Sequence, residues 1–286
     1  MKVNGKEIAQ EILKDIAHQI NEQKRLGREF RIVGILVGDS STGSGQAAKK
    51  FLELKKIVAQ KVGIEFRIRE FPKEISTRDL RKEIVDIARA ELNTGIIVEL
   101  PLPSHINTQY VLNAIPEEKD IDVLSQKSQG VFFTGRSVIL PPTVETVKII
   151  FEKYGIDPKG KICAVFGYGL LVGRPICHWL ASFGATVISI NEHTPEPHLF
   201  SSMANIIVTG VGKVGLITQE MIKDKVIVID FGYTYSGGKI YGDVDFENVN
   251  EKAILITPVP GGVGPIVIAT VLKNLITLYR SYKKSG

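Results

Sequence analysis

The sequence predicts an α/β protein made of two units with a cleft between them, each unit a parallel sheet with helices packed on it. Short apolar runs rich in β-branched residues recur along the chain, and helical stretches separate them. This alternation pauses after residue 100 and begins again near Leu140, which indicates two units of one architecture. With 286 residues, 44% of them hydrophobic, the chain is long enough to form two cores.

The first unit begins with a predicted amphipathic helix over residues 6–26, in which the apolar positions repeat at helical spacing. Buried strands are expected at 31–37 and 95–100, and a strand of alternating apolar and polar residues is expected at 65–71. Helices are expected at 46–62, where Gly63 provides the C-terminal stop, and at 77–93. Strands that alternate with helices in this way form a parallel sheet.

The second unit repeats the pattern. A helix over 143–154 is followed by strands at 161–166, 185–190, 205–209, 225–230 and 254–256, with helices over 174–183 and 265–281. The domain boundaries predicted from this pattern are 1–139 and 140–264, and the segment 104–140 joins the two units.

Composition excludes several classes of protein. The apolar fraction excludes a disordered or fibrous chain, and no apolar run approaches the roughly 20 residues of a membrane span. The polar N-terminus lacks the features of a secretory signal, and Cys163 and Cys177 are too few for a disulfide framework. The histidines lack metal-ligand spacing, and the net charge of +5 is spread over many segments. We therefore expect a cytoplasmic protein with no metal and with neither nucleic acid nor membrane as a partner.

A glycine-rich turn is the first functional motif. The predicted strand 161–166 runs into Gly167, Tyr168 and Gly169, and a helix starts after Gly173 and Arg174. Glycines at such a turn let the backbone approach a pyrophosphate, which binds at the positive end of the helix. A glycine triplet alone is weak evidence, but its position between a strand and a helix predicts a nicotinamide-cofactor domain.

Further candidates for cofactor binding follow the next strands. Asn191 and Glu192 come directly after strand 185–190, and Glu192 stands about where an acidic residue binds an adenosine ribose. A carboxylate there repels a 2′-phosphate, so we expect NAD rather than NADP, although a solvated loop glutamate is the alternative. The remaining candidates lie at the carboxyl ends of later strands, where open α/β sheets bind ligands: Gly210, Gly212, Gly232 and Tyr233.

Several segments together resemble the bifunctional methylenetetrahydrofolate dehydrogenase/methenyltetrahydrofolate cyclohydrolase family. They are ILVG (35–38), VELPLP (98–103), EKDID (118–122), VGRP (172–175), GDVDF (242–246) and ITPVPGGVGP (256–265). The resemblance implies a folate-binding catalytic domain, a Rossmann-like NAD(P) domain, and a C-terminal helix (265–286) that returns to the first domain. It also implies a homodimer, a place in one-carbon metabolism and purine biosynthesis, and a tetrahydrofolate substrate that is oxidised from methylene to methenyl and then hydrolysed to the 10-formyl form.

The resemblance also assigns site residues. The family has Tyr-x-x-x-Lys on the helix after the first strand; counting back from Gly63 places these at Phe51 and Lys55, on one helix face. Counting forward from Gly38, over a loop (39–47) that is longer than usual for the family, selects Gln46 and Lys50 instead. Lys55 is favoured as the catalytic lysine, since a longer loop is tolerated better than a helix insertion.

The remaining assignments concern the folate. Asp122 corresponds to the aspartate that holds the pterin, with a solvated turn aspartate as the alternative, and Pro101, Gly261, Gly262 and Val263 correspond to substrate-binding positions. Val123 replaces the glycine that follows this aspartate in the family, so we expect a different local backbone.

Other departures bear on activity. Glu99 stands where the family has glutamine, and a carboxylate there would pair with the lysine and raise its pKa. Together with the missing phenol at Phe51, it weakens the case for the cyclohydrolase step. Tyr168 replaces an arginine, which again favours NAD. Three alternatives stay open: a dehydrogenase without cyclohydrolase activity, another oxidoreductase that shares the cofactor domain, and a non-catalytic folate- or nucleotide-binding protein.

Overall fold

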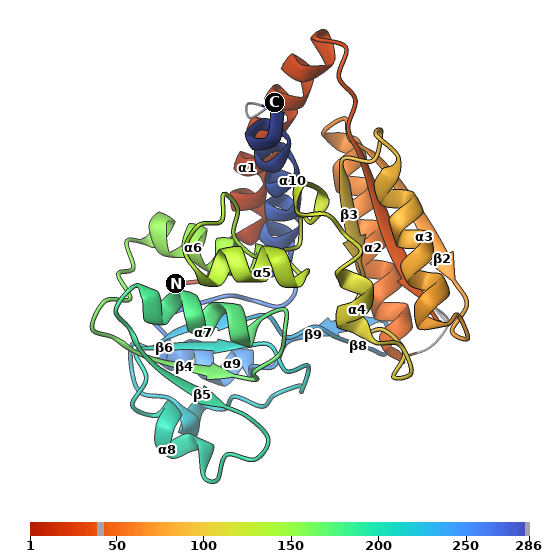
Figure 1. The fold of residues 1–286 in the computed structure, drawn as a ribbon. Coiled ribbons are helices and arrows are strands. Elements are labelled where there is room, and N and C mark those ends of the chain that lie inside the picture. The colour runs from red at the N-terminus through yellow and green to blue at the C-terminus, as the bar shows by residue number, and fades with distance from the viewer. Residues whose placement is uncertain (39–42, 284–286) are drawn as a thin grey trace. The chain divides into compact units, whose positions relative to one another are not determined.

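The fold is that of a computed structural model, which describes residues 1–38 and 43–283 (Figure 1). It divides into two compact units. One comprises Gln10–Pro142 and the chain from Ile268 onward, and is called here the three-stranded unit. The other comprises Met1–Ala9 and Thr143–Val267, and is called the five-stranded unit. The two α/β units expected from the sequence are therefore confirmed.

The three-stranded unit has a parallel sheet in the order β2-β1-β3. Its strands are β1 (Arg31–Val37), β2 (Glu65–Phe71) and β3 (Gly95–Val98), and β1 in the centre is almost wholly buried. The connecting helices α2 (Gly43–Lys61) and α3 (Thr77–Arg89) run alongside this sheet (Figure 1). The side chain of Ser76 caps α3 by accepting a hydrogen bond from the backbone of Asp79, so the helix begins where the sequence predicts.

Two long helices complete this unit, namely α1 (Gly5–Arg25) and α10 (Val263–Lys283), whose first residues belong to the other unit. Helix α10 packs against β3 so closely that a Cβ atom at Gly95 would lie 2.8 Å from Leu275 Cδ1. The Asn274 side chain donates to the carbonyl oxygens of Ile121 and Leu140, at 2.9 Å each. The C-terminal helix thus returns to this unit, as expected.

Residues Val263–Tyr282 of α10 are long and apolar enough to cross a membrane by length and composition alone, contrary to the expectation from the sequence. However, 61% of that stretch is buried inside the structure, and Thr270 and Asn274 make buried hydrogen bonds. The apolar character of α10 is accounted for by packing in a protein core.

The segment that joins the two units contains short helices that the sequence reading left undivided: α4 (Thr108–Leu112), η1 (Glu117–Lys119) and α5 (Gln126–Phe133). Each of the two α-helices starts after a side-chain cap, Asn107 for α4 and Ser125 for α5.

The five-stranded unit has a parallel sheet in the order β10-β7-β6-β4-β5. Its strands are β4 (Ile162–Phe166), β5 (Thr186–Ile190), β6 (Ile206–Thr209), β7 (Ile227–Asp230) and β10 (Leu255–Ile256). The other elements are α6 (Pro142–Tyr154), α7 (Gly173–Ser182), α8 (Pro197–Ser201), η2 (Gln219–Met221), the hairpin β8 (Thr234–Ser236) with β9 (Lys239–Tyr241), and α9 (Phe246–Lys252). In-register pairing aligns Phe166 with Thr209 and Thr209 with Asp230, so three strands end at one edge of the sheet.

The N-terminal residues belong to this second sheet. Val3 N donates to Ile256 O at 2.9 Å, and Ile256 N donates to Met1 O at 3.0 Å. Residues 1–9, which the sequence-based boundary assigned to the domain 1–139, therefore group with the five-stranded unit. This pairing joins residues about 250 positions apart, and local sequence patterns carry no information on such a partner.

Candidate functional site

A buried lysine on α2 is the centre of the site in the three-stranded unit. Lys55 is almost wholly buried, whereas Lys50 and Gln46, the alternative pair from sequence counting, are exposed. The burial follows from close packing of the helix on the sheet: a Cβ atom at Gly34 in β1 would lie 2.6 Å from Leu52 Cδ1. Lys55 lies one turn after Leu52 and so faces the same side.

Lys55 has two neighbours that the family resemblance placed with it. Its Nζ lies 4.9 Å from the centre of the Phe51 ring, as the i, i+4 spacing predicts. The same Nζ donates a hydrogen bond to Oε1 of Glu99, which directly follows β3. The side chains of Lys55 and Glu99 are 7% and 9% exposed, so this is a buried ion pair.

The charges around Lys55 determine its protonation. Burial alone would lower the pKa of Lys55, but the carboxylates of Glu99 and Asp122 more than offset this and hold the pKa above its ordinary value. Asp122 is affected in turn: removal from water raises its pKa to about 6, although Lys55 lowers it. Lys55 is therefore a stable ammonium at neutral pH.

The loop that carries Asp122 is held by its neighbour. The buried Asp120 carboxylate accepts hydrogen bonds from Leu124 N at 3.1 Å and from Ser125 N at 2.8 Å. Val123, which lies between Asp120 and Leu124 in this loop, has φ 58°, the left-handed conformation that glycine adopts readily. Such a conformation costs a β-branched residue on the order of 1–3 kcal/mol, which the surrounding hydrogen bonds must offset. Asp120 is thus structural, and Asp122 is left to interact with Lys55.

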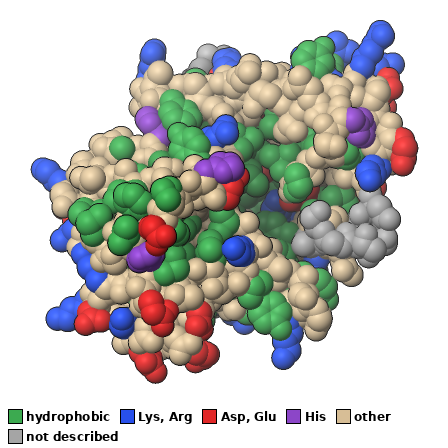
Figure 2. All heavy atoms as spheres, turned by 90° about the horizontal axis from the view of Figure 1, so that it is seen from below, with side chains coloured by type: hydrophobic (Ala, Val, Ile, Leu, Met, Phe, Trp, Pro, Cys, Tyr) green, Lys and Arg blue, Asp and Glu red, His purple; other side chains and the backbone are tan. Residues whose placement is uncertain are grey.

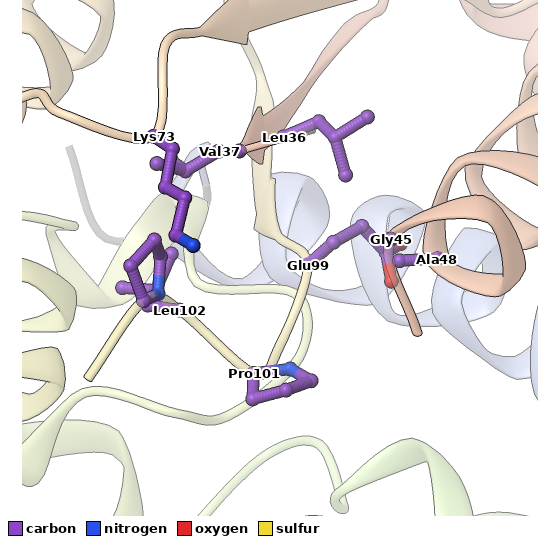
Figure 3. Close-up of a pocket in the computed structure, with 10 residues that line it drawn as sticks. Leu36, Val37, Gly45, Ala48, Lys73, Glu99, Pro101 and Leu102 are labelled. Atoms are coloured by element: carbon purple, nitrogen blue, oxygen red, sulfur yellow. The ribbon is translucent and has the colours of Figure 1, made fainter. Parts of the chain in front are cut away.

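A pocket of about 280 Å³ lies beside this cluster, within the three-stranded unit. Figure 3 shows the Glu99 side chain directed toward Gly45 and Ala48 of α2, and the Lys73 side chain directed toward Leu102. The walls of the pocket come from the end of β1, from residues that follow β1, β2 and β3, and from the start of α2: Leu36, Val37, Gly38, Gly45, Ala48, Lys73, Glu99, Pro101, Leu102 and Pro103. A wall that mixes apolar side chains with polar surface, including one acid and one base, suits a flat, partly polar molecule.

Sequence reasoning identified Glu99 and Pro101 in this pocket but missed the other lining residues, Lys73 above all. Lys73 follows β2 within two residues of the strand end, at the carboxyl edge of the sheet. That position was the available signal, because ligands bind at this edge in open α/β sheets.

The glycine-rich turn in the five-stranded unit is tightly packed. Gly167 has φ 88°, and a Cβ atom at Gly173 would lie 1.9 Å from Gly167 O, so both positions require glycine. No heavy atom lies within 4 Å of a Cβ built at Gly169. Helix α7 starts at Gly173 without a side-chain cap, but Arg174 N donates to Gly169 O at 3.1 Å and Pro175 has no N–H. What this turn offers an anion is therefore chiefly the positive end of the helix dipole.

The side chains at this turn interact with each other. Arg174 Nε donates to Tyr168 O at 3.0 Å, and its guanidinium lies 5.5 Å from the centre of the exposed Tyr168 ring. At the end of the neighbouring strand β5, the Asn191 side chain accepts from His193 N at 2.9 Å, and the Glu192 side chain is 81% exposed. Gly167 N donates to Ile190 O at 2.7 Å, which places the turn beside these two residues.

The remaining predicted cofactor residues lie at the ends of β6 and β7. A Cβ atom at Gly210 would lie 2.8 Å from Val172 Cγ1, and one at Gly232 would lie 2.4 Å from Asp243 N. Gly212 follows in the loop after β6, where its carbonyl accepts from Thr234 Oγ1 at 3.1 Å, and Tyr233 directly follows Gly232. The glycines that follow three strands therefore lie at one edge of the sheet, with Gly232 buried against Asp243.

The predicted substrate residues Gly261, Gly262 and Val263 lie in the five-stranded unit, where Val263 is the first residue of α10. Gly5 N donates to Gly261 O at 3.1 Å, and a Cβ atom at Gly5 would lie 1.7 Å from Gly262 O. The N-terminal segment thus fixes this loop.

In the view of Figure 2, basic side chains are interspersed with acidic and uncharged ones.

Comparison with known proteins covers nearly the whole chain. A sequence model of the tetrahydrofolate dehydrogenase/cyclohydrolase catalytic domain matches residues 3–122, and one of the family's NAD(P)-binding domain matches residues 141–283. A bifunctional protein FolD from Nautilia profundicola is 38% identical over 283 residues, which cover 99% of this chain and 98% of the relative. One from a Nitratiruptor species is 38% identical over 286 residues, covering 99% of both chains.

Solved structures agree with these matches. The bifunctional FolD methylenetetrahydrofolate dehydrogenase/cyclohydrolase of Campylobacter jejuni superposes with a TM-score of 0.91 at 31% identity and covers 99% of both chains. The corresponding Trypanosoma brucei enzyme, solved with NADP cofactor and an inhibitor, gives a TM-score of 0.92 at 29% identity and covers 99% of this chain and 98% of its own.

Proposed function

This chain belongs to the tetrahydrofolate dehydrogenase/cyclohydrolase family, and from that premise we propose how its own residues carry out the family's two reactions. The enzyme oxidises 5,10-methylenetetrahydrofolate to the methenyl form by hydride transfer to NAD(P), and hydrolyses that product to 10-formyltetrahydrofolate. The observation that carries the proposal is the buried group of Lys55, Glu99 and Asp122, which lies in a chain that matches both family domains.

The five-stranded unit suits a nicotinamide cofactor. The positive end of α7 and the open space at Gly169 in the glycine-rich turn suit a pyrophosphate. Gly210, Gly212 and Gly232 would border the rest of the cofactor, which supplies the acceptor for the hydride. The protein's part in that step is placement of donor and acceptor.

The three-stranded unit would hold the folate. The pocket beside Glu99 has apolar walls from Leu102 and Pro101 for the flat rings, and the Asp122 carboxylate would accept hydrogen bonds from ring N–H groups. Lys73 at the same pocket is a cation suited to a carboxylate of the substrate's glutamyl tail.

Glu99 is expected to affect the two reactions in opposite directions. Hydride loss turns the folate's one-carbon bridge into a delocalised cation. The ionised cluster has one positive and two negative charges, which favours that cation. Hydrolysis instead needs a group that takes a proton from the attacking water, and a neutral Lys55 would serve. Because Glu99 keeps Lys55 protonated, we infer that hydrolysis is the slower of the two steps.

The cofactor preference is proposed to be NAD. Glu192 extends from the end of β5, beside the glycine-rich turn, and its carboxylate would repel a 2′-phosphate while accepting from a ribose hydroxyl. Arg174, the cation of this turn, is hydrogen-bonded to the carbonyl of Tyr168. The Trypanosoma brucei relative was solved with NADP, so the preference of this chain for NAD is tested by comparing the two cofactors directly.

The deciding experiment mixes purified enzyme with 5,10-methylenetetrahydrofolate and either NAD or NADP, and records reduced cofactor and methenyl product separately. Reduced cofactor accompanied by transient methenyl that then decays is the expected result. Reduced cofactor with an equal and permanent methenyl yield supports the second candidate, a dehydrogenase without cyclohydrolase activity, which the Lys55–Glu99 pair favours. No reduction with either cofactor overturns the proposal.

We also propose a homodimer that works in the cytoplasm and supplies one-carbon units for purine biosynthesis. These proposals rest on the family resemblance. Sedimentation of the purified chain at twice its mass of 31.5 kDa is the expected result for the dimer, and sedimentation at the monomer mass would contradict it.

A further inference from the structure

A buried aspartate that was not among the expected site residues lies behind the loop that follows β6. Asp243 belongs to the GDVDF segment between β9 and α9, and none of its surface is exposed. A carboxylate in such a place is costly unless its oxygens are fully hydrogen-bonded. Its partners therefore show what it holds.

All three donors that reach the Asp243 carboxylate come from the end of β6 and the loop after it. Oδ2 accepts from Thr209 Oγ1 at 2.8 Å and from Val211 N at 2.7 Å. Oδ1 accepts from Lys213 N at 2.8 Å. One side chain thus fixes both ends of the loop 210–213, which has no helix or strand hydrogen bonds of its own.

The loop 210–213 in turn borders the glycine-rich turn. A Cβ atom at Gly167 would lie 2.8 Å from Val211 Cγ1, and one at Gly210 would lie 2.8 Å from Val172 Cγ1. The two loops are therefore packed to the limit that glycine allows. A displacement of Val211 would change the space at the turn.

A second buried aspartate fixes Asp243 itself. Asp230 Oδ1 accepts from Gly232 N at 2.7 Å and from Asp243 N at 3.2 Å, and its Oδ2 accepts from Val244 N at 3.1 Å. A Cβ atom at Gly242 would lie 2.1 Å from Asp230 Oδ2. Burial raises the pKa of Asp230 to about 6, with backbone donors opposing the shift. The two aspartates connect the end of β7 to the loop after β6.

We propose that Asp243 is a positioning residue for the nicotinamide cofactor, acting through the loop 210–213 on the surface that borders the glycine-rich turn. The inference rests on the proposed function, since it takes this surface to be the cofactor site. The residue itself touches loop backbone and Thr209 rather than the cofactor.

The test uses the two activities of the enzyme, because hydrolysis of the methenyl substrate needs no nicotinamide. Asp243→Asn keeps the shape of the side chain but replaces one carboxylate oxygen by an NH₂ group, which cannot accept a hydrogen bond. Because Val211 N and Lys213 N both donate to the carboxylate, one of these two backbone contacts is lost in either orientation of the amide. We expect the KM for NAD(P), and its Kd by calorimetry, to rise about tenfold or more, which corresponds to about 1.4 kcal/mol. The cyclohydrolase rate should stay within about twofold of the unmodified enzyme.

The matched control is Asp245→Asn. Asp245 lies two residues further on and bonds the exposed side chain of Asn248, so its change should leave both activities unaltered. If Asp243→Asn does not fold, Thr209→Val removes only one of the three donors and should still raise the KM for the cofactor.

A purely structural role would lower both activities together and leave the KM for NAD(P) unchanged, and that result would overturn the inference. Failure of the proposed function is distinguishable, because the unmodified enzyme would then lack both activities. Calorimetric Kd values for NAD(P) would still report on Asp243 in that case, and an unchanged Kd in Asp243→Asn would refute its role.

Discussion

Replacing Glu99 by glutamine removes one negative charge from a buried ion pair while keeping an oxygen that accepts from Lys55. Both side chains are less than a tenth exposed, so solvent screens the pair only weakly. Two unit charges about 4 Å apart attract by about 4 kcal/mol at an effective dielectric of about 20. Since about 1.4 kcal/mol is a factor of ten, the protonation equilibrium of Lys55 changes by up to about a thousandfold.

Asp122 remains beside Lys55 and keeps part of that stabilisation, so we expect a rise of about tenfold to a hundredfold in the neutral amine at a given pH. The cyclohydrolase kcat of Glu99→Gln should rise by about tenfold, and the rising limb of its pH profile should move to lower pH. The dehydrogenase kcat should fall, because the developing cation loses a nearby negative charge.

The assay follows methenyl consumption without nicotinamide at several pH values, and separately follows reduced cofactor formed from the methylene substrate. Glu53→Gln is the matched control, since Glu53 lies on the same helix and pairs with Lys56 at 3.6 Å on the exposed face. It should change neither rate. Loss of hydrolysis in Glu99→Gln with intact dehydrogenase activity would refute this reasoning, because Glu99 itself would then be the base.

Four further predictions concern the two units. The pKa of Asp122 is raised to about 6, so its carboxyl group is mostly neutral below that pH. The KM for the folate should therefore rise as the pH falls through 6, and Asp122→Asn should abolish this pH dependence. Glu192→Ser should increase kcat/KM for NADP relative to NAD by about tenfold, measured in initial rates, and an unchanged ratio would contradict its role. Lys73→Ala should raise the KM for polyglutamylated folates a few-fold at low salt and less at high salt, whereas Lys82→Ala on α3 should not. Gly173→Ala should lower the Tm, since its Cβ would meet Gly167 O, whereas Gly169→Ala should leave it unchanged; equal Tm values would contradict the packing argument.

The sequence predicted the strands well because their signal is local. The bounds of β1 and β2 agree with the apolar run at 31–37 and the alternating stretch at 65–71. Lys55 was placed by fitting the Tyr-x-x-x-Lys motif of the family, counted back from Gly63. The contact between Lys55 and Glu99 was expected from the family resemblance, which places Glu99 at the position of the lysine's partner.

Long-range contacts could not be predicted in this way. The hydrogen bonds to the Asp243 carboxylate come from donors 30 to 34 residues away along the chain. The pairing of Val3 with Ile256 joins residues near opposite ends of the chain. Val123 shows another limit. A β-branched residue rarely adopts the left-handed φ that Val123 has. The hydrogen bond from Leu124 N to the Asp120 carboxylate holds the backbone in this conformation against the local preference of the side chain.

In the proposed mechanism, the two reactions make opposite demands on one buried lysine. Hydride loss creates a cation and is favoured by negative charge nearby, yet the same negative charge keeps Lys55 protonated and unable to take a proton from water. A neutral side chain at position 99 would favour proton transfer from water to Lys55 and disfavour hydride loss, and a carboxylate would do the reverse. If this proposal holds, the identity of this one side chain sets how much methenyl intermediate leaves the site before it is hydrolysed, independently of how the five-stranded unit holds the cofactor.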